Sequence, residues 1–507
     1  MRYKSLADCF VETFSARADK PAITFLRDGG LETQISYGQL QRDSSRMAGV
    51  FQGLGVVKGD RVILFIRKSL VFVVAHLALQ KIGAVTVPLN PGFKKSEMAY
   101  LLQDADAAAI LLEPESEALV RELEPRLKIL AVDTRRPYQE ENVGRHAAEN
   151  FIPPEISADD AGLIIYTSGT TGQPKGAVLT QANLIHDARN VIGIWEISHI
   201  DVLCHALPLF HVHGLGFALH TALLAGAHTV MLDQFSPGRV IETLSRKDNF
   251  AACTVFMAVP AMYVKLMAFL GARLPSFDHV RLWTCGSAPL QPADFERIGR
   301  VFGKEPVERE GMSETGMNFS NPLRGRRKPG SIGMALPGLA VRIVDPVTGA
   351  QAAAGRTGEL WLKGPAITPG YWRKPEETAR SFERGWFKTG DLGHADADGY
   401  FYLTDRIKHI IISGGENISP KEIEAVINQV DGVAESSVVG VADERWGEKV
   451  VAAVVKKPGS KVGAAEIQAA CKRHLHDWKC PKAVVFVKEL PRNTMGKVLK
   501  EKVKASF

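Results

Sequence analysis

Cysteine is scarce in this chain, and the few cysteines are scattered rather than clustered. Only six of the 507 residues are cysteine, namely Cys9, Cys204, Cys253, Cys285, Cys471 and Cys480. Small domains that depend on disulfides carry cysteine at a much higher density. The spacing therefore excludes a disulfide scaffold and favours a reducing compartment, which we expect to be the cytoplasm.

Long hydrophobic runs are also missing. The most apolar stretch, residues 69–79, is too short to cross a bilayer and contains His76. The N-terminal segment carries Asp8, Glu12 and Asp19 within its apolar part, which a secretory signal does not do. We therefore expect a soluble protein with no integral membrane segment.

A strong excess of one charge is absent as well. Lys and Arg number 62 against 56 Asp and Glu, a net charge of +6. Nucleic-acid-binding proteins usually show a denser basic stripe, so we expect no nucleic-acid partner. Residues 408–507 hold 17 Lys and Arg against 12 Asp and Glu, which fits a solvated surface or attraction to a small polyanion. With 45% hydrophobic and 23% charged residues, the composition is that of a globular protein with sizeable cores.

From Arg61 to about Gly330, strand-like and helical stretches alternate. The pattern predicts a buried strand over 61–66, a helix over 70–83 that ends at Gly83, and a strand over 84–90. Similar apolar runs recur at residues 107–113, 161–166, 227–232, 252–257 and 280–285. Strands that alternate with helices are typical of parallel sheets covered on both faces, so we expect an α/β fold.

After Gly330 the pattern changes to short β-like runs separated by glycine and proline. These runs cover residues 339–349, 358–364, 370–374, 385–393 and 399–405. They predict a compact antiparallel β region that completes a large domain over residues 1–405. Residues 406–507 predict a small α+β domain, with helices over 419–430 and 464–475 and strands over 436–442, 449–455 and 483–490.

The strongest chemical signal is the run TSGTTGQPKG from Thr167 to Gly176, directly after a predicted strand. Its glycines and hydroxyl side chains leave N–H and O–H donors free to surround phosphate oxygens, and Lys175 adds a positive charge. It is not a Walker A loop, because Lys175 is followed by Gly176 rather than by Ser or Thr. The alternative is a flexible surface turn, but so long a specified run rarely arises by chance.

Four weaker motifs follow along the chain. Glu314 lies on a Gly- and hydroxyl-rich turn that suits Mg²⁺. Asp391 follows a tight turn and could accept both hydroxyls of a ribose. Arg406 and Lys408 stand at the predicted domain junction, and Lys497 lies on a glycine turn near the C-terminus. Each of these residues, taken alone, could equally be a solvated surface residue.

Taken together, the motifs resemble one family. TSGTTGQPKG, GMSETG, TGDLG, DRIKHIIISGGENISPKEIE and PRNTMGK occur in the order found in AMP-forming acyl-CoA synthetases of the adenylate-forming superfamily. The resemblance covers nearly the whole chain. It implies that a carboxylic acid reacts with ATP to give an acyl-adenylate and pyrophosphate, and that coenzyme A then takes the acyl group and releases AMP. It further implies ATP, Mg²⁺ and coenzyme A as ligands and a mobile C-terminal domain, and it leaves a homodimer open.

The resemblance also implies residue roles. The catalytic groups would be Lys497, Glu314, His211 and Lys175. Nucleotide and coenzyme A would contact Thr167, Ser168, Gly169, Thr170, Thr171, Gly172, Lys175, Gly286, Ser287, Ala288, Arg309, Glu310, Gly311, Met312, Ser313, Asp391, Arg406, Ser413, Gly414, Gly415 and Lys497. The acid would contact His211, Arg281, Gly286, Gly311, Met312 and Met317. Thr167 and Glu314 would hold Mg²⁺, and Lys408 would be the hinge.

Two positions depart from the family pattern. An aromatic residue usually precedes the glycine of the Gly-Met-Ser-Glu motif and stacks near adenine, but Glu310 stands here. An acidic residue is common after the hinge lysine, but His409 stands here. The first departure concerns the adenine contact rather than the chemistry.

For the acid, the segments HALPLFHVHGL and GMSETGMNFSNP are similar to malonyl-CoA synthetases. In that group an arginine before the Gly-Ser-Ala turn, here Arg281, binds a dicarboxylate, which favours malonate or methylmalonate. The alternative is that Arg281 pairs with an acidic residue of the protein. A medium-chain fatty acid or an aryl acid is the second candidate substrate, with the apolar helix 216–226 beside a hydrophobic tunnel.

Functions of other classes are also open. A non-catalytic nucleotide-binding protein could keep the fold, and an adenylating enzyme could deliver to a carrier protein or to oxygen. Cys471, His474, His476 and Cys480 superficially resemble a zinc site, but one helix rarely surrounds a tetrahedral ion. His205, His211 and His213 could suggest a second metal site, but no carboxylate is near them in the sequence.

Overall fold

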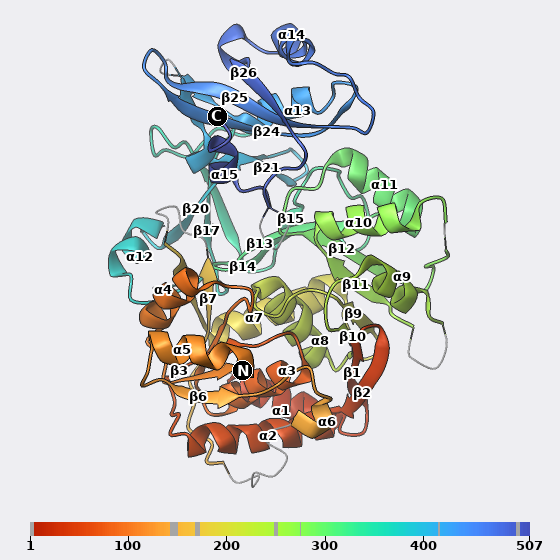
Figure 1. The fold of residues 1–507 in the computed structure, drawn as a ribbon, viewed down its shortest axis with the longest axis vertical. Helices are drawn as coiled ribbons and strands as arrows, with labels where there is room; N and C mark the ends of the chain where they lie inside the picture. The colour runs from red at the N-terminus through yellow and green to blue at the C-terminus, as the bar shows by residue number, and fades with distance from the viewer. Residues whose placement is uncertain are drawn as a thin grey trace. The chain divides into compact units, whose positions relative to one another are not determined.

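The chain forms two compact units. This computed structural model describes residues 5–141, 151–167, 173–247, 252–273, 275–413, 416–492 and 497–507. The first unit comprises Met1–Ala340 with Lys363–Phe387, and the second comprises Val341–Leu362 with Lys388–Phe507. Figure 1 follows the chain from red at the N-terminus to blue at the C-terminus. The expected α/β class, with large N-terminal sheets and a small C-terminal α+β part, is confirmed.

Among the described residues, the largest sheet has nine strands in the order β15-β14-β13-β12-β11-β9-β10-β1-β2. In that order their bounds are Met334–Ala335, Gly316–Ser320, Val307–Met312, Leu282–Gly286, Val255–Ala258, Val202–His205, His228–Leu232, Pro21–Arg27 and Gly30–Ser36. Pairs from β13 through β1 are parallel, and the pairs at both edges are antiparallel. Because parallel strands share one carboxyl edge, Gly286 at the end of β12 lies opposite Arg309 of β13.

The second sheet of the described chain has seven strands in the order β18-β8-β7-β4-β3-β5-β6. Their bounds are Gly370–Tyr371, Lys175–Thr180, Ala161–Thr167, Val85–Pro88, Arg61–Phe65, Ala109–Leu112 and Lys128–Ala131. One expectation is wrong here, because residues 370–374 do not join the later β region. Tyr371 instead pairs with Ala177 of β8. The position of a two-residue strand is decided by the strand with which it pairs, because its own sequence is too short to show a pattern.

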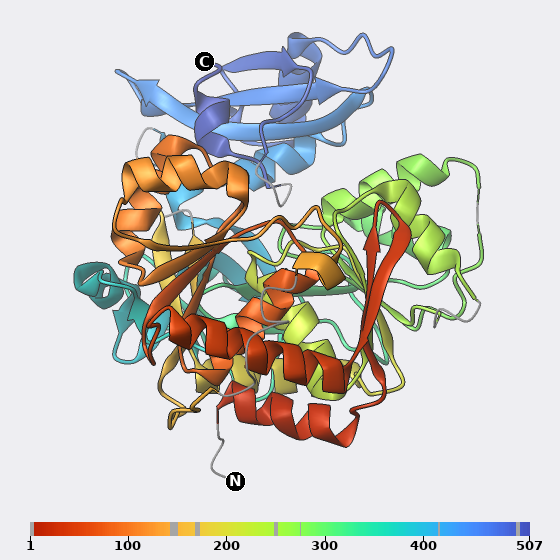
Figure 2. The ribbon, with the colours of Figure 1, turned by 60° about the horizontal axis from the view of Figure 1, so that its bottom comes forward.

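Helices pack on both sheets of the first unit. They are α1 Leu6–Ala16, α2 Tyr37–Gly53, α3 Leu70–Lys81, α4 Lys95–Ala105, η1 Pro114–Ser116, α5 Glu117–Leu123, α6 Tyr138–Glu141, α7 Gln181–Trp195, η3 His213–His220, α8 Thr221–Ala225, α9 Pro237–Ser245, α10 Pro260–Leu270, α11 Pro292–Phe302 and α12 Pro375–Ser381. Figure 2 shows α1 and α2, in red, side by side. The segment η3 is a π-helix, a rare form that is frequent at functional sites.

Helix α3 forms the centre of the core, and the prediction of a helix over 70–83 is confirmed. The Ser69 hydroxyl accepts a hydrogen bond from the Phe72 N–H at 3.3 Å and begins the helix. Gly83, with φ of +66°, turns the chain away after its end. All 12 side chains of α3 are buried, because α1 and α2 cover it. Each large apolar side chain buried in this way contributes roughly 1.5–3 kcal/mol.

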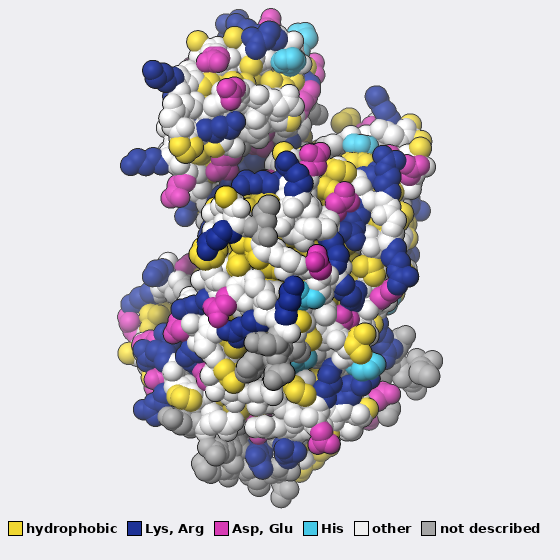
Figure 3. All heavy atoms as spheres, turned by 90° about the vertical axis from the view of Figure 1, so that its right-hand side faces the viewer, with side chains coloured by type: hydrophobic (Ala, Val, Ile, Leu, Met, Phe, Trp, Pro, Cys, Tyr) yellow, Lys and Arg dark blue, Asp and Glu magenta, His cyan; other side chains and the backbone are white. Residues whose placement is uncertain are grey.

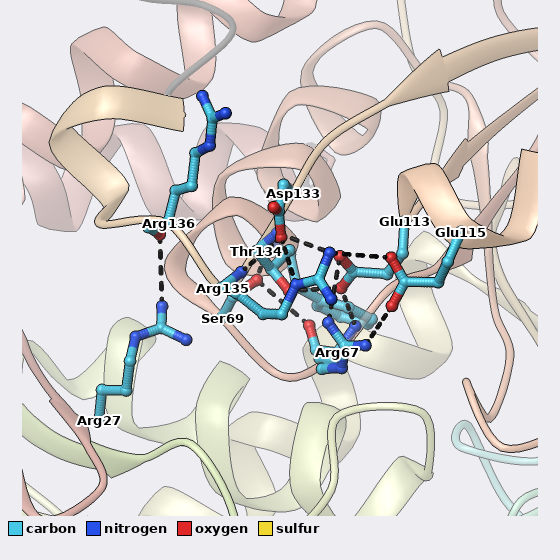
Figure 4. Close-up of polar contacts among 10 residues, drawn as sticks. Arg27, Arg67, Ser69, Glu113, Glu115, Asp133, Thr134, Arg135 and Arg136 are labelled. Carbon is cyan, nitrogen blue, oxygen red and sulfur yellow. Dashed lines mark hydrogen bonds and ion pairs between the residues drawn. The ribbon is translucent and has the colours of Figure 1, made fainter.

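A polar network joins the loops that follow β3, β5 and β6 (Figure 4). Glu113, which is only 3% exposed, accepts hydrogen bonds from the backbone N–H groups of Arg67 and Thr134, both at 3.1 Å. Its neighbour Glu115 forms ion pairs with Arg67 and Arg135. The network thus fixes the loops at the carboxyl edge of the second sheet, since a buried carboxylate is stable only when it is paired.

The later part of the chain forms two smaller sheets. Among the described residues, β16 Ala340–Val344, β17 Gly358–Lys363, β20 Trp386–Ala395, β19 Phe382–Glu383 and β21 Phe401–Arg406 make the predicted β region. The last sheet contains β23 Glu416–Ile418, β22 Ile411–Ser413, β25 Gly447–Lys456, β24 Val433–Asp443 and β26 Ala483–Val487. Its helical elements are η4 Ile407–His409, α13 Pro420–Ile427, α14 Ala464–His474, η5 Asp477–Lys479 and α15 Lys500–Lys504. The predicted order of helices and strands after residue 406 is confirmed.

The surface and the cysteines agree with the composition. On the face shown in Figure 3, Lys and Arg side chains alternate with Asp and Glu. Every cysteine is a free thiol; Cys9 is half-buried and the other five are buried. Across the described ranges, no helix is both long and apolar enough to cross a membrane.

A buried pair of histidines in the first unit predicts a pH dependence of stability. The rings of His76 and His220 stack at 5.0 Å, and their Nε2 atoms lie 2.8 Å apart. Burial lowers the pKa of His220 to about 3 and that of His76 well below its usual value. The folded state therefore keeps both rings neutral, while the unfolded chain takes up protons below about pH 6.5.

We expect the unfolding free energy to be highest above about pH 6.5 and to fall as the pH is lowered. The variant His220→Gln removes one of these groups, so its stability should fall less steeply. Between pH 7 and pH 5 the advantage of the wild type should shrink by about 1 to 2 kcal/mol in denaturant titrations. An advantage that stays constant over this range would contradict the assignment.

Candidate active site

Glu314 lies where the two large sheets meet. It follows β13 in the nine-stranded sheet, and its Oε1 lies 3.4 Å from the Oγ1 of Thr167 at the end of β7. The Tyr371 hydroxyl donates a hydrogen bond to the same oxygen at 3.1 Å. Burial and the Glu314 charge raise the pKa of Tyr371, which therefore stays a donor. Residues Ser168, Gly169, Thr170, Thr171 and Gly172 lie outside the described residues.

The hairpin of β13 and β14 fixes the position of Glu314. Gly311 pairs with Met317, and a Cβ on Gly311 would lie 2.6 Å from the Gly316 carbonyl oxygen, so only glycine fits. The Glu314 carbonyl accepts a hydrogen bond from the Thr368 N–H at 2.7 Å. The carboxylate is 8% exposed and forms no ion pair within the described chain. Carboxylate and hydroxyl oxygens are ligands that Mg²⁺ prefers, so Glu314 and Thr167 fit the expected metal.

Lys175 stands at the start of β8, opposite Thr167. Its ammonium forms an ion pair with Glu377 and lies 5.5 Å from the ring centre of Tyr371. The structure therefore brings two of the predicted nucleotide residues, Thr167 and Lys175, close to Glu314, the predicted catalytic and metal-binding carboxylate.

Arg309 forms a second centre, deeper in the first unit. Its guanidinium is 2% exposed, contacts the Nε2 of His213 and donates to the Ser287 hydroxyl at 3.3 Å. It also lies 5.4 Å from the ring centre of Phe217. Within the described residues, Arg309 forms no ion pair and its Nε has no hydrogen-bond partner. Burial lowers its pKa to about 10, so the side chain is still a cation at neutral pH.

The backbone around Ser287 is strained. Ser287 adopts φ of +67°, an unusual value for a residue other than glycine. A Cβ on the preceding residue, Gly286, would lie 2.4 Å from the Arg309 carbonyl oxygen. Strain of this kind is typical of functional sites, where it aims a side chain. Here it turns the Ser287 hydroxyl towards Arg309 and the Nδ1 of His213, at 3.2 Å.

Histidines line the segment that leads into η3. Burial lowers the pKa of His211 to about 4 and that of His213 well below its usual value. Both rings are therefore neutral at pH 7 and can accept hydrogen bonds. His205 bonds through Nε2 to the Gly214 carbonyl at 2.9 Å.

The structure places Arg281 away from these residues. It stands at the amino end of β12, whereas Gly286 closes the carboxyl end. Arg281 donates two hydrogen bonds to the Asp201 carboxylate, at 2.7 and 2.8 Å. Further bonds at 3.0 Å reach the carbonyls of Trp195 and Glu196. Pairing within the protein, the alternative weighed for Arg281, is the arrangement observed.

The methionines and Glu310 complete this region. Met312 lies on β13, and the N–H of Met317 on β14 donates to the buried Asp187 carboxylate at 2.7 Å. Burial raises the pKa of Asp187 to about 7. Glu310 accepts a hydrogen bond from the Asn318 side chain at 3.0 Å. Ser313 directly follows β13, and Ala288 lies two residues after the end of β12.

The second unit carries the remaining predicted residues. Asp391 and Arg406 are paired across β20 and β21, and the Arg406 Nε lies 2.5 Å from the carboxylate. Lys408 lies in η4 and Ser413 closes β22, while Gly414 and Gly415 fall outside the described ranges. The pKa of Lys497 is lowered to about 8, first by loss of solvation around its ammonium group and then by the charge of Arg406.

Neither metal site suggested by cysteine and histidine is present in the described part of the chain. No group of three or more His, Cys, Asp or Glu there could hold an ion. Cys471 and Cys480 are buried in the apolar core of the last sheet, which explains their spacing.

The sequence reasoning missed Tyr371, Glu377 and Asp187. Asp187 could have been found, because a carboxylate among the apolar residues that follow the phosphate run, now seen to form α7, is unusual. No feature of the sequence pointed to Tyr371 or Glu377, because their contacts depend on a pairing between segments about 200 residues apart.

Comparison with known proteins agrees with this arrangement. The family model "AMP-binding enzyme" matches residues 10–372, and "AMP-binding enzyme C-terminal domain" matches residues 422–497. A feruloyl-CoA synthase of Amycolatopsis is 34% identical over 96% of both chains. A mitochondrial malonate–CoA ligase (ACSF3) of Bos taurus is 34% identical over 88% of this chain and 81% of the relative.

Solved structures show the same fold. ATP-bound MatB from Rhodopseudomonas palustris is 36% identical, covers 100% of this chain and 99% of its own, and superposes with a TM-score of 0.92. Both the family match and the relatives extend over most of the chain, in agreement with the order of its motifs. The chain therefore belongs to the AMP-binding enzyme family and is an AMP-forming acyl-CoA ligase.

Proposed function

We propose that this ligase activates a small carboxylic acid that carries a second negative group, with malonate or methylmalonate as the first candidates. The observation that carries the proposal is the buried guanidinium of Arg309, which lacks an ion-pair partner in the described chain. A buried charge without a partner costs several kcal/mol. A substrate carboxylate beside Arg309 would offset this cost through a charge-assisted hydrogen bond.

The surrounding residues support an acid site at this place. Ser287 and His213 already contact Arg309, and the neutral His211 nearby adds a polar group without a competing charge. Gly286 and Gly311 leave no side chain between the strands. The name of the Bos taurus relative points to malonate as well.

A hydrophobic acid is the second candidate. The relative from Amycolatopsis is named for feruloyl-CoA at the same identity. The segment η3, whose Phe217 lies beside Arg309, is apolar and buried and continues into α8, which would suit an aryl or a medium-chain fatty acid.

In the first half-reaction the acid carboxylate would attack the α-phosphorus of ATP and displace pyrophosphate. Lys175 and the run that begins at Thr167 would bind the β- and γ-phosphates, and Asp391 would accept the ribose hydroxyls. Lys497 would contact the carboxylate and the α-phosphate, where negative charge increases. Glu314 and Thr167 would hold Mg²⁺, which when bound supplies positive charge to the phosphate oxygens.

In the second half-reaction coenzyme A would displace AMP. We propose that the small domain turns about Lys408, and that Ser413 with Gly414 and Gly415 then lines the path of the pantetheine. Under this proposal Lys497 serves only the first step.

Acid-dependent exchange of labelled pyrophosphate into ATP tests the adenylation step without any thiol. Malonate, methylmalonate, octanoate, benzoate and ferulate form the panel, and AMP release with coenzyme A follows for the acids that exchange. Exchange with none of the acids would overturn the proposal, and exchange with octanoate or ferulate alone would favour the second candidate.

Arg309→Met should lower kcat/KM for malonate by about 100-fold, because it removes the cation but keeps an apolar side chain of similar length. The value for octanoate should change much less. Arg281→Met is the matched control: it breaks the Asp201 ion pair and should lower thermal stability without changing the ratio of malonate to octanoate. A change of that ratio in the Arg281 variant alone would restore Arg281 as the substrate ligand.

Lys497→Ala should reduce pyrophosphate exchange by more than about 100-fold, because one positioned donor is typically worth that much. Thioester formation from supplied acyl-adenylate and coenzyme A should stay near the wild-type rate. The exposed Lys488→Ala is the control and should change neither step. Equal loss of both steps would contradict the assigned role.

Tyr371→Phe should raise the Mg²⁺ concentration for half-maximal exchange by roughly three- to tenfold. The hydroxyl that orients Glu314 is lost, and a hydrogen bond to a charged group is worth about 1.5–3 kcal/mol at most. The ring near Lys175 remains, so KM for ATP at saturating Mg²⁺ should stay close to that of the wild type. An unchanged Mg²⁺ dependence would show that Tyr371 does not act through Glu314.

A further inference from the structure

The lysine at the end of the phosphate run is already paired. The Lys175 ammonium contacts the Glu377 carboxylate, and the two side chains are only 12% and 23% exposed. Glu377 comes from the segment Thr368–Ser381, which we name the strap and which contains β18 and α12. Lys175 is the positive group of the phosphate run. The Glu377 carboxylate therefore occupies the position beside its ammonium where a phosphate oxygen of ATP is expected to bind.

The strap is fastened to the same strand that carries Lys175. The Trp372 N–H donates to the Gly176 carbonyl at 2.8 Å, and the Thr368 hydroxyl donates to the Val178 carbonyl at 2.5 Å. The Thr378 hydroxyl in turn accepts from the Tyr371 N–H at 2.9 Å. These bonds fix the start of α12 beside β8. The backbone of the strap therefore places Glu377 beside Lys175.

Glu377 has a second cation within reach. Arg380, one helical turn on, lies 3.5 Å from its other oxygen. The pKa of Glu377 is lowered, mainly by its hydrogen bond to Lys175, so the carboxylate is ionised. If Lys175 moves away, Arg380 remains beside Glu377, and loss of the first pair does not leave an isolated charge.

We propose that Glu377 is a positioning residue that holds Lys175 beside the strap and yields it to the triphosphate of ATP, so that its charge sets the affinity for ATP. The inference rests on the proposed role of Lys175 in binding phosphate. Two anions then compete for one ammonium, because the carboxylate must be exchanged for phosphate oxygens when ATP binds. The same competition favours release of pyrophosphate, when Lys175 returns to Glu377.

Glu377→Gln in the full chain is the direct test. Without the competing charge, the Kd for ATP with Mg²⁺ and the KM for ATP in pyrophosphate exchange should both fall by about three- to tenfold. The Ki of pyrophosphate should fall in parallel. The affinity for AMP, which lacks the β- and γ-phosphates, should not change, and a merely structural role would not produce this difference.

The chain offers a matched control in Glu376. It is one residue away, 82% exposed, and pairs with Arg380 rather than with Lys175. Glu376→Gln makes the same chemical change and should leave the affinities for ATP, pyrophosphate and AMP unchanged. An equal gain in ATP affinity in both variants would mean a general effect of surface charge and would overturn the proposal.

Two further results separate this inference from the proposed function. In a Lys175→Gln background, Glu377→Gln should no longer change the Kd for pyrophosphate by more than about twofold; an undiminished effect would show that Glu377 does not act through Lys175. If Lys175→Gln itself leaves ATP affinity unchanged, the role of Lys175 fails. An unchanged or higher Kd for ATP in Glu377→Gln, with Lys175 still required, overturns the inference alone.

Discussion

The contact between Glu314 and Thr167 joins the two large sheets of the first unit. Thr167 ends a strand of the seven-stranded sheet, and Glu314 lies on the hairpin that edges the nine-stranded sheet. The Tyr371 hydroxyl and the Thr368 N–H hold the same residue from the strap. Since the phosphate run begins at Thr167, any shift of one sheet against the other would separate the run from the carboxylate. The rest of the site depends on this register.

The two cations of the first unit are stabilised in opposite ways. Lys175 is partly exposed and is neutralised by a carboxylate of the protein. Arg309 is buried, its direct contacts are neutral groups and a ring, and it forms no ion pair within the described residues; the Glu310 and Asp187 carboxylates act on it only from beyond contact distance. Under the proposed roles, a phosphate group would have to displace Glu377 from Lys175, whereas an anionic acid would find no carboxylate of the described residues in contact with Arg309. The site would then bind the acid tightly and release pyrophosphate readily.

Much of the fold could be predicted from the sequence, because alternating apolar runs and glycine positions are local. Strand β3, helix α3 and the order of elements after residue 406 follow from such patterns. Contacts between distant segments could not be predicted. Arg281 precedes Gly286 by only five residues, but a strand rises about 3.3 Å per residue, so the two lie about 16 Å apart at opposite ends of β12. Nearness in sequence suggested a shared pocket, while the strand geometry separates them. In the sequence, Arg309 belongs to the motif assigned to adenine. Only the structure shows that its side chain is buried and forms no ion pair within the described residues.

The state of the thiols has a practical consequence. Five of the six cysteines are buried and Cys9 is half-buried. Burial also raises the pKa of Cys9, Cys285, Cys471 and Cys480, and a hydrogen bond with Cys253 together with burial raises that of Cys204, so few reactive thiolates exist at neutral pH. A maleimide dye should therefore react far faster with a cysteine introduced on the surface than with the native ones. Pairs of fluorophores can then be attached without first removing the natural cysteines, and the proposed rotation of the small domain can be tested during turnover.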